Sequence, residues 1–518
     1  MLRRQTLIAS GLTVVLLAAG CAATPDEPAR APDESAPSAG LAAFHEQEIE
    51  FEPCASYATS PADEELFDDE RFDCSRVEVP LDYAEPDGAR GEVALLRVPA
   101  RGDKIGSLLV NPGGPGASGM VFAAALVDAW AASEVGERFD VVGFDTRGVG
   151  ASTPAVDCYS DEETDRNEPP WPYLLSVTSQ EEAEDVAGRC VEGTGGVAEL
   201  TSVGSANVVQ DMDVLRAVLG DDQLSYLGYS YGSELAAMYA EAYPQNVRAI
   251  VIDGAVDPEL SEPALRQSQF TAFQKAFDGM AALCAEQDDC PLGTDPGGAS
   301  AEFRELVAPL RDEPAPTSGG RALTYEDALQ AMTLSLLSSG QWPALVEGLA
   351  GLADGDGTGL LTLHDLLLGR GADGRYGSTL DMDANLATRC MDNPRTPAEQ
   401  DDLLRHARDV APFMALGLPE DGSVYECAAW PEPVSRDIPW TTGDVDVPPT
   451  LTVSVTGDPG TPHQGGINMA SRLGGSLLTV EGAQHGVALY GGSACVDDVV
   501  TDYLVDLRTP PEDARCTL

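Results

Sequence analysis

The stretch Gly228-Tyr229-Ser230-Tyr231-Gly232, together with the segments on either side of it, indicates the fold. A β-rich run, Gln223–Gly228, leads into it, and a helical pattern from Glu234 to Tyr243 follows. A serine between two glycines in such a strand-to-helix turn exposes its hydroxyl at the end of the sheet, in the arrangement known as a nucleophile elbow. We therefore predict that Ser230 is a catalytic nucleophile.

Outward from this turn, short β-rich runs alternate with helical patterns, which predicts an α/β fold with a mostly parallel sheet and crossover helices. The predicted strands are Arg76–Pro80, Gly91–Val98, Ser107–Asn111, Phe139–Phe144, Gln223–Gly228, Arg248–Ile252, Leu451–Val455 and Leu477–Val480. Helical periodicity dominates between the sixth and seventh of these runs, and one helix start is marked by Thr396, Pro397 and Glu399. We expect a core in two parts, residues 46–257 and 445–518, interrupted by a helical cap over residues 258–444.

A serine hydroxyl needs a base within hydrogen-bond reach and an acid that orients the base. Of the five histidines, His485 alone follows the last predicted strand, and His463 is the competitor. Asp458 follows the strand Leu451–Val455 and completes the chain order Ser230, Asp458, His485. The alternative for Asp458 is a turn residue, because Gly and Pro surround it.

Acyl transfer also requires donors for the oxyanion of the tetrahedral intermediate. The glycine-rich run Asn111–Gly116 follows a predicted strand, and we assign the N–H groups of Gly114 and Tyr231 to this role. Such a run could instead bind phosphate, but it lacks both the P-loop Lys-Ser/Thr and the GxGxxG spacing.

The N-terminus is typical of an export signal. Basic residues at Met1–Arg4 precede an apolar stretch, Leu7–Ala19, and small residues then lead to Cys21. We predict a lipoprotein signal peptide over residues 1–20, lipidation of Cys21 and a disordered tether over residues 21–45. The protein would then be exported and held on the outer face of the cell membrane. The alternative is ordinary cleavage and full secretion.

Charge and cysteine content restrict the partners and cofactors. The formal net charge of −56, from 30 Lys+Arg and 86 Asp+Glu, argues against nucleic acid. Eleven cysteines less Cys21 leave ten, an even number that predicts disulfides in an oxidising compartment. Connectivity does not follow from the sequence, but the simplest local pairing is Cys54–Cys74, Cys158–Cys190, Cys284–Cys290, Cys390–Cys427 and Cys495–Cys516. No CxxC pair exists, so we expect no metal and no redox site.

Taken together, the motifs resemble a known group of proteins. They are Gly113–Gly116, Asp145–Ser152, the serine turn, Asp458-x-x-Thr461-Pro462, His485-Gly486, Trp342-Pro343, Cys390-Met391-Asp392, Cys427-x-x-Trp430 and the Cys495…Cys516 tail. Their order is similar to that of exported α/β-hydrolases of the proline iminopeptidase and tripeptidyl-aminopeptidase type, including carboxylesterase A-like surface serine proteases. Asn111-Pro112 stands where proline iminopeptidases usually have His, which favours the tripeptidyl-aminopeptidase branch.

The resemblance implies an α/β-hydrolase fold without a cofactor. It also implies release of short peptides, tripeptides above all, from free N-termini of peptides or proteins. An aminopeptidase must bind the substrate α-ammonium, and Asp392 and Glu426 are the acids we consider for it, with Thr461 as a further candidate substrate-binding residue. A carboxylesterase or lipase would use the same triad. A non-catalytic surface lipoprotein should lack a triad member, and none is missing here.

Overall fold

The computed structural model describes residues 40–131, 133–393, 400–419, 422–431, 442–443, 445–490 and 492–518, all within one compact unit, Pro37–Leu518. The predicted signal peptide, Cys21 and the helix start at Thr396–Glu399 lie outside the described residues. Its strands are β1 (Asp73–Pro80), β2 (Arg90–Val98), β3 (Gly106–Asn111), β4 (Phe139–Phe144), β5 (Leu224–Tyr229), β6 (Val247–Asp253), β7 (Leu451–Val455), β8 (Ser476–Glu481) and β9 (Arg515–Thr517).

All nine strands form one sheet, in the order β1-β2-β4-β3-β5-β6-β7-β8-β9. Strands β1 and β2 pair antiparallel at one edge, and β2 also runs antiparallel to β4. From β4 onward, through β3 to β9, each pair of neighbouring strands is parallel. The predicted mostly parallel sheet is confirmed. The strand β9, which pairs with β8 at the other edge, was not predicted from the sequence.

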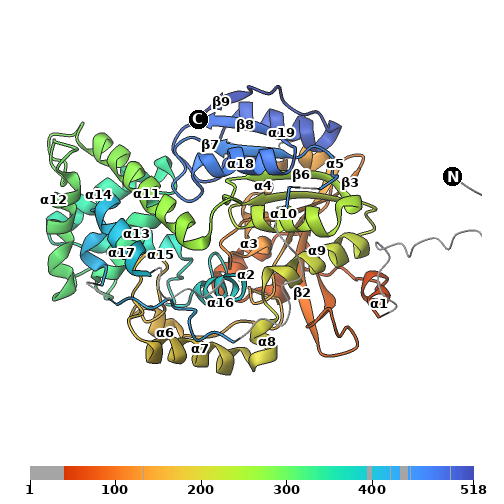
Figure 1. The fold of residues 1–518 in the computed structure, drawn as a ribbon, viewed down its shortest axis with the longest axis horizontal. Coiled ribbons are helices and arrows are strands. Elements are labelled where there is room, and N and C mark those ends of the chain that lie inside the picture. Colours follow the sequence, from red (N-terminus) through yellow and green to blue (C-terminus); the bar gives the residue numbers. More distant parts are fainter. Residues whose placement is uncertain are drawn as a thin grey trace, which may run out of the picture. The chain divides into compact units, whose positions relative to one another are not determined.

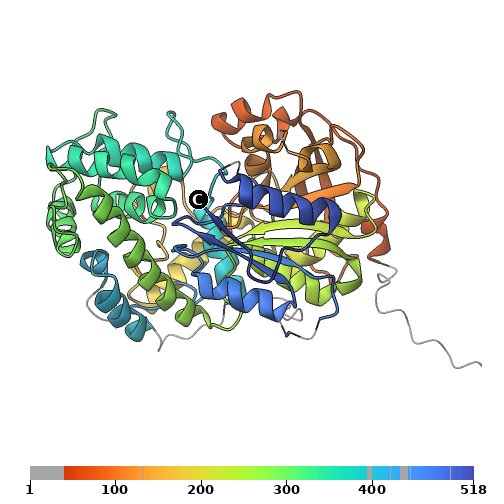
Figure 2. The same cartoon turned by 90° about the horizontal axis from the view of Figure 1, so that it is seen from above.

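Alternation along the strands gives the sheet two apolar faces. On β6, for example, Ala249 and Val251 point to one face, and Ile250 and Ile252 to the other, because successive side chains of a strand alternate. The first face is covered by α2 (Pro61–Phe67), α3 (Gly119–Ala125), α4 (Val127–Ala131), α5 (Val135–Arg138) and α19 (Ala494–Asp506). The second is covered by α1 (Ala42–His45), α9 (Ser205–Val218), α10 (Gly232–Ala242) and α18 (His463–Arg472), so helices lie on both sides of the sheet (Figure 2).

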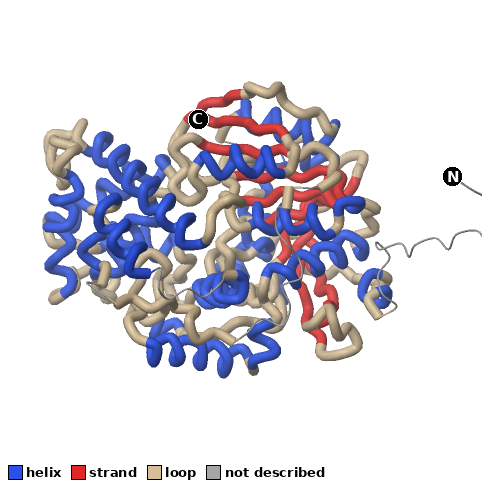
Figure 3. Tube along the Cα trace, in the orientation of Figure 1, coloured by secondary structure: helices blue, strands red, loops and turns tan. Residues whose placement is uncertain are grey.

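The expected helical block between β6 and β7 is present and builds a core of its own. It contains α11 (Glu262–Cys284), α12 (Ala299–Val307), α13 (Tyr325–Ser335), α14 (Trp342–Ala353), α15 (Thr358–Leu367) and α17 (Gln400–Val410). These helices lie together at one side of the sheet (Figures 1 and 3). None of the described strands falls within this block. None of the helices in the described part of the chain is long and apolar enough to cross a membrane.

Two segments cross the division at residue 257 that the sequence suggested. Trp171, Leu174 and Leu175 come from the first part of the chain but pack into the core of the helical block. Conversely, α16 (Met382–Asp392) packs with α7 (Gln180–Thr194) and α8 (Val197–Thr201) in a smaller core. The five local disulfide pairs proposed above are all formed, and Cys158–Cys190 and Cys390–Cys427 lie in this smaller core.

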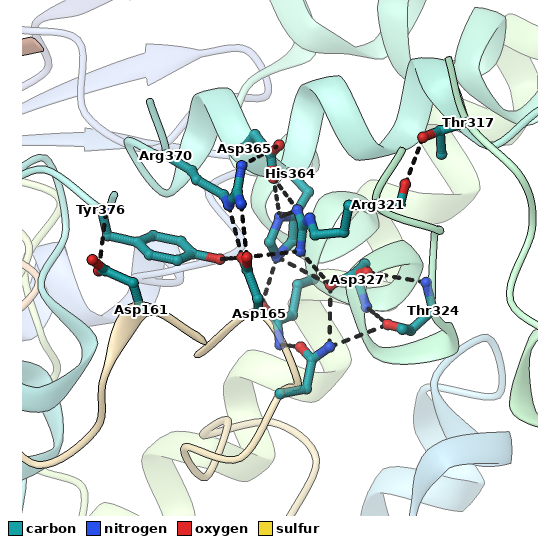
Figure 4. A network of polar contacts seen from close by, with 12 residues as sticks. Asp161, Asp165, Thr317, Arg321, Thr324, Asp327, His364, Asp365, Arg370 and Tyr376 are labelled. Carbon is teal, nitrogen blue, oxygen red and sulfur yellow. Dashed lines mark hydrogen bonds and ion pairs between the residues drawn. The ribbon is translucent and has the colours of Figure 1, made fainter. Parts of the chain in front are cut away.

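A polar network also joins the segment after β4 to the helical block (Figure 4). Asp165, which follows α6 (Asp161–Thr164), accepts two hydrogen bonds of 2.7 Å from the Arg370 guanidinium and one of 3.0 Å from the Tyr376 hydroxyl. Arg321 pairs with Asp365, and the buried His364 lies 3.0 Å from the same carboxylate. These half-buried ion pairs link residues that lie far apart in the chain. The network therefore holds the two parts of the chain together.

Candidate active site

The serine turn has the geometry that its sequence predicts. Ser230 follows β5 with φ +53°, an uncommon conformation for a residue with a side chain, and its amide donates to the Asp253 carbonyl at 3.0 Å. A Cβ on Gly228 would lie 2.4 Å from the Gly232 carbonyl oxygen, and one on Gly232 would lie 2.9 Å from Asn111 Oδ1. Both glycines are therefore required for α10 to start directly over the end of the strand.

Asp458 and His485 meet at the same edge of the sheet. Parallel strands end at one edge, and the two residues follow β7 and β8. His485 Nδ1 lies 2.9 Å from Asp458 Oδ2, and Oδ1 of this carboxylate accepts from the amides of Gly460 at 2.8 Å and Thr461 at 2.9 Å. Burial alone would lower the pKa of His485, but the charge and hydrogen bond of Asp458 outweigh burial, so the pKa is raised above its usual range. The carboxylate, which is 2% exposed, holds the imidazole with Nε2 free for proton transfer.

Ser230 and His485 follow strands at the same edge of the sheet but share no hydrogen bond in the described structure. Strand β6 separates β5 from β7, and a Cβ on Gly254, the residue after β6, would lie 3.3 Å from both Asp458 Oδ2 and His485 Cε1. Among the described residues the Ser230 hydroxyl makes no hydrogen bond to His485. Catalytic hydrogen bonds are often long without substrate and tighten when it binds.

The glycine-rich run lies against the serine turn. Gly113 has φ +101°, and a Cβ there would lie 2.6 Å from the Tyr229 carbonyl oxygen and 2.8 Å from Ser230 Cβ. In the part of the chain that the structure describes, the N–H groups of Gly114 and Tyr231 have no hydrogen-bond acceptor. Two unpaired backbone donors beside a serine are the arrangement that stabilises an oxyanion.

The helical block makes hydrogen bonds to main-chain groups of the His485 loop, the Asp458 turn and the glycine-rich run. The His485 amide donates to the Leu337 carbonyl at 2.7 Å, just after α13. Gln269 of α11 donates from Nε2 to the Gly460 carbonyl at 2.8 Å, in the turn that carries Asp458. Asn385 of α16 donates from Nδ2 to the Pro115 carbonyl at 2.9 Å, in the glycine-rich run. The block is therefore part of the scaffold that positions the site.

The three candidate substrate-binding residues all have protein partners. Thr461 is 2% exposed, and its hydroxyl donates to Asp458 Oδ2 at 2.9 Å. Glu426 accepts from Arg389 at 2.9 Å and Arg266 at 3.1 Å; burial alone would raise the pKa of Glu426, but these two charges lower it. Asp392 accepts from Ser205, through its amide at 3.0 Å and its hydroxyl at 2.5 Å.

Two acids near the site, Glu234 and Asp253, were not predicted from the sequence. Glu234 stands four residues after Ser230, and burial, followed by the charge of Asp392, raises the pKa of its carboxyl to about 8. Asp253 ends β6 and is fully buried. The position of Asp253, directly after a predicted strand, is the same signal that located Asp458.

Three other histidines, His45, His406 and His463, contact groups away from the catalytic residues. His463 Nδ1 lies 2.8 Å from the buried Ser454 hydroxyl at the start of α18. His45 Nε2 lies 3.2 Å from Asp213, and His406 Nε2 lies 3.1 Å from the Gln267 carbonyl. None of the three has a described contact with Ser230 or Asp458.

The run Asp145–Ser152, one of the motifs that carry the resemblance, makes buried hydrogen bonds within the fold. Asp145 accepts hydrogen bonds from the Ser118 hydroxyl at 2.5 Å and the Ala151 amide at 3.0 Å. Arg147 is fully buried and forms a two-bond pair of 2.7 Å with Asp211. This run therefore stabilises the fold, and its residues make no described contact with Ser230 or His485. Among the described residues, no group of three or more His, Cys, Asp and Glu is placed to hold a metal ion.

A parallel sheet with a serine on the strand-to-helix turn after β5 and a histidine after β8 defines a serine hydrolase. A family model described as the alpha/beta hydrolase fold matches residues 106–491, and the chain belongs to this family. It is 43% identical over 460 residues to the serine protease Hip1 of Mycobacterium tuberculosis, which covers 86% of this chain and 87% of that protein.

Two further relatives cover similar shares. Carboxylesterase B of Mycobacterium tuberculosis is 40% identical over 452 residues, 86% of each chain. The tripeptidyl aminopeptidase of Streptomyces lividans is 30% identical over 505 residues, 90% of this chain and 86% of that one.

Proposed function

We propose that the protein is an aminopeptidase that releases short peptides, tripeptides above all, from free N-termini through an acyl-enzyme on Ser230. The enzyme is a serine peptidase of the α/β-hydrolase fold. The observation that carries the assignment of roles is the 2.9 Å pair of Asp458 and His485 on the turns beside the Ser230 elbow. The 43% and 30% identities to a serine protease and to a tripeptidyl aminopeptidase support the peptidase reading.

The chemistry follows from these positions. His485 Nε2 takes the proton from Ser230 Oγ as the oxygen attacks the scissile carbonyl carbon, and Asp458 stabilises the imidazolium. The oxyanion accepts hydrogen bonds from the N–H groups of Gly114 and Tyr231. The C–N bond then breaks, and His485 gives its proton to the leaving amine. Water, deprotonated by the same imidazole, releases the N-terminal peptide and restores Ser230.

The α-ammonium of the substrate is bound by an acid of the helical block, and Asp392 is the better candidate. Its partner Ser205 also lies 2.6 Å from the hydroxyl of Tyr231, the residue after the nucleophile. Glu234, whose pKa is about 8 next to Asp392, provides a second carboxyl that a bound cation would ionise. Glu426 is less suitable because Arg266 and Arg389 already neutralise it, and Thr461 serves to orient Asp458.

The test compares free and N-acetylated peptides of one sequence. Acetylation removes the ammonium charge and with it the attraction to the acid. This loss should raise the activation free energy by about 3 kcal/mol, which lowers kcat/KM roughly a hundredfold. Asp392→Asn should lose this preference for the free amine, and Glu426→Gln is the matched control that should keep it. Equal kcat/KM for both peptides with the unmodified enzyme would contradict the aminopeptidase assignment.

A second candidate function is ester hydrolysis, which the 40% identity to a carboxylesterase favours. The same triad cleaves both bonds, but a peptidase must also protonate an amine leaving group. A tripeptidyl anilide and a nitrophenyl ester, compared by kcat/KM, separate the two. Peptidases also cleave activated esters, so the decisive result for an esterase is ester turnover without anilide turnover.

The cellular arrangement completes the proposal. Residues 1–20 act as a lipoprotein signal peptide, Cys21 is lipidated, and the segment between Cys21 and α1 (Ala42–His45), which packs on the sheet, tethers the catalytic part to the outer face of the membrane. Residues 46–257 and 445–518 form the hydrolase core, and residues 258–444 form the cap that limits entry to chain ends. The basic start, the apolar stretch and the small residues before Cys21 support the anchor.

A further inference from the structure

Strand β6 ends between the turns that carry the proposed nucleophile and acid. The sheet order is β5-β6-β7-β8, and these four strands are parallel. Ser230 follows β5, Asp458 follows β7 and His485 follows β8. The last residue of β6, Asp253, is therefore brought to the centre of the site by topology alone.

Asp253 contacts the two turns that must act together. Its main-chain carbonyl accepts from the Ser230 amide at 3.0 Å. Its Oδ2 accepts from the amides of Val487 at 2.5 Å and Ala488 at 2.6 Å, in the loop that carries His485. One residue thus fixes the serine turn with its main chain and the base loop with its side chain.

The other carboxylate oxygen is not used in this way. Asp253 is fully buried, and its Oδ1 has no hydrogen-bond donor among the described residues. A buried carboxylate oxygen without a donor destabilises the fold, because its charge has lost water and gained no hydrogen bond in return. A residue that served only to hold the loop would be replaceable by an uncharged acceptor such as Asn. The charge itself therefore needs an explanation.

The charge acts on the histidine. Burial lowers the pKa of His485, the charge and hydrogen bond of Asp458 raise it, and the charge of Asp253 raises it further. Burial raises the pKa of Asp253 itself to about 6, against the effect of its two amide donors. The titratable groups that share this space with Asp253 are Asp458, His485, Tyr229 and Tyr490. Above about pH 6 the imidazole thus has two carboxylates near it.

We propose that Asp253 is a positioning residue of the active site, which holds the loop of His485 through Oδ2 and supplies a second negative charge that stabilises the imidazolium. This proposal rests on the proposed function, because it takes His485 as the base. In acylation the imidazole gains the serine proton, and Asp253 stabilises that protonated form as it does in the free enzyme. No proton moves to or from Asp253 in the reaction above pH 6.

The test is the pH dependence of kcat/KM in Asp253→Asn. The amide is isosteric and keeps an oxygen for the Val487 and Ala488 amides, so it removes the charge and leaves the tether. Without the charge the imidazolium is less stable. The acid limb of the profile, where kcat/KM falls because His485 is protonated, should therefore move to lower pH by about half a unit or more. The plateau should fall by no more than the corresponding factor, because one pH unit equals a tenfold change in stabilisation.

Asp383 provides a matched control. Its Oδ2 also accepts from two successive amides, Cys158 at 2.6 Å and Tyr159 at 2.9 Å, and burial raises its pKa to about 6 as well. Asp383→Asn should therefore lower stability as Asp253→Asn does, and should leave the acid limb in place. An acid limb that moves equally in both variants, or in neither, would overturn the proposal.

A measurement without turnover keeps the proposal testable if Asp253→Asn is inactive. In the Ser230→Ala background the titration of the His485 ring can be followed by NMR, with the resonance assigned by its loss in His485→Gln. The pKa of His485 should fall when Asp253→Asn is added, and an unchanged pKa refutes the charge effect. Full activity of Ser230→Ala would instead refute the proposed function, so the two failures are distinct.

Discussion

Gly113→Ala tests how closely the glycine-rich run must approach the serine turn. The added methyl would lie 2.6 Å from the Tyr229 carbonyl oxygen and 2.8 Å from Ser230 Cβ, and φ is +101°. Neither neighbouring atom is the far end of a flexible side chain, so neither can move aside by a rotation. The run has to shift away from the turn, and the N–H group of Gly114 shifts with it.

The expected magnitude has two parts. The left-handed conformation costs a residue with a Cβ about 1–2 kcal/mol, and insertion of a methyl into a tightly packed site costs about 1–3 kcal/mol. The sum is a loss of roughly 2–5 kcal/mol in stability. If the shift removes one oxyanion donor, kcat should fall by about 10²–10³-fold.

Gly220→Ala is the control for the backbone part. Gly220 follows α9 with φ +81°, and a Cβ there would meet no atom within 4 Å. It should cost about 1 kcal/mol and leave kcat unchanged. The assay is kcat on a tripeptidyl anilide together with the denaturant midpoint of each variant. Wild-type kcat in Gly113→Ala, with a stability loss no larger than that of Gly220→Ala, would refute the close-approach argument.

Three further changes test other parts of the molecule. Ser230→Ala should lower turnover by about 10⁶-fold with the fold intact, and near-wild-type activity in a clean preparation would exclude the serine as nucleophile. Cys21→Ser should leave the protein as precursor or free of the membrane, since about 0.8 kcal/mol per buried CH₂ of the acyl chains is lost; unchanged detergent partitioning would contradict lipidation. Arg147→Met should destabilise by about 3–5 kcal/mol in denaturant unfolding because it leaves Asp211 buried without its partner, and a loss below 1 kcal/mol would show that the pair matters little.

The β-rich runs predicted the main strands, and the Gly-x-Ser-x-Gly motif predicted the serine turn. The ends of all eight predicted strands lie within three residues of the ends of strands in the structure. Strand β9 was not predicted because it has three residues, and Cys516 is the buried one among them. Its place beside β8 depends on strand pairing, and the Cys495–Cys516 disulfide, although the sequence predicted it, does not by itself indicate a strand.

The contacts between the helical block and the site could not be predicted for a different reason. Leu337 holds the base loop through its carbonyl, which every residue type carries, so no sequence pattern marks it. Asp253 follows a predicted strand, as Asp458 does, so its place at this edge of the sheet was predictable. A catalytic triad needs one acid, however, and with Asp458 in that role no sequence pattern indicates a function for Asp253.

These contacts change what the cap can do. A lid that swings away as a rigid body would have to break the bonds from His485 to Leu337, from Gln269 to Gly460 and from Asn385 to Pro115. Each of these bonds ends on a turn that carries the base, the acid or the oxyanion donors, so an opened block would loosen the site at three points at once. We infer that the block stays fixed against these three turns.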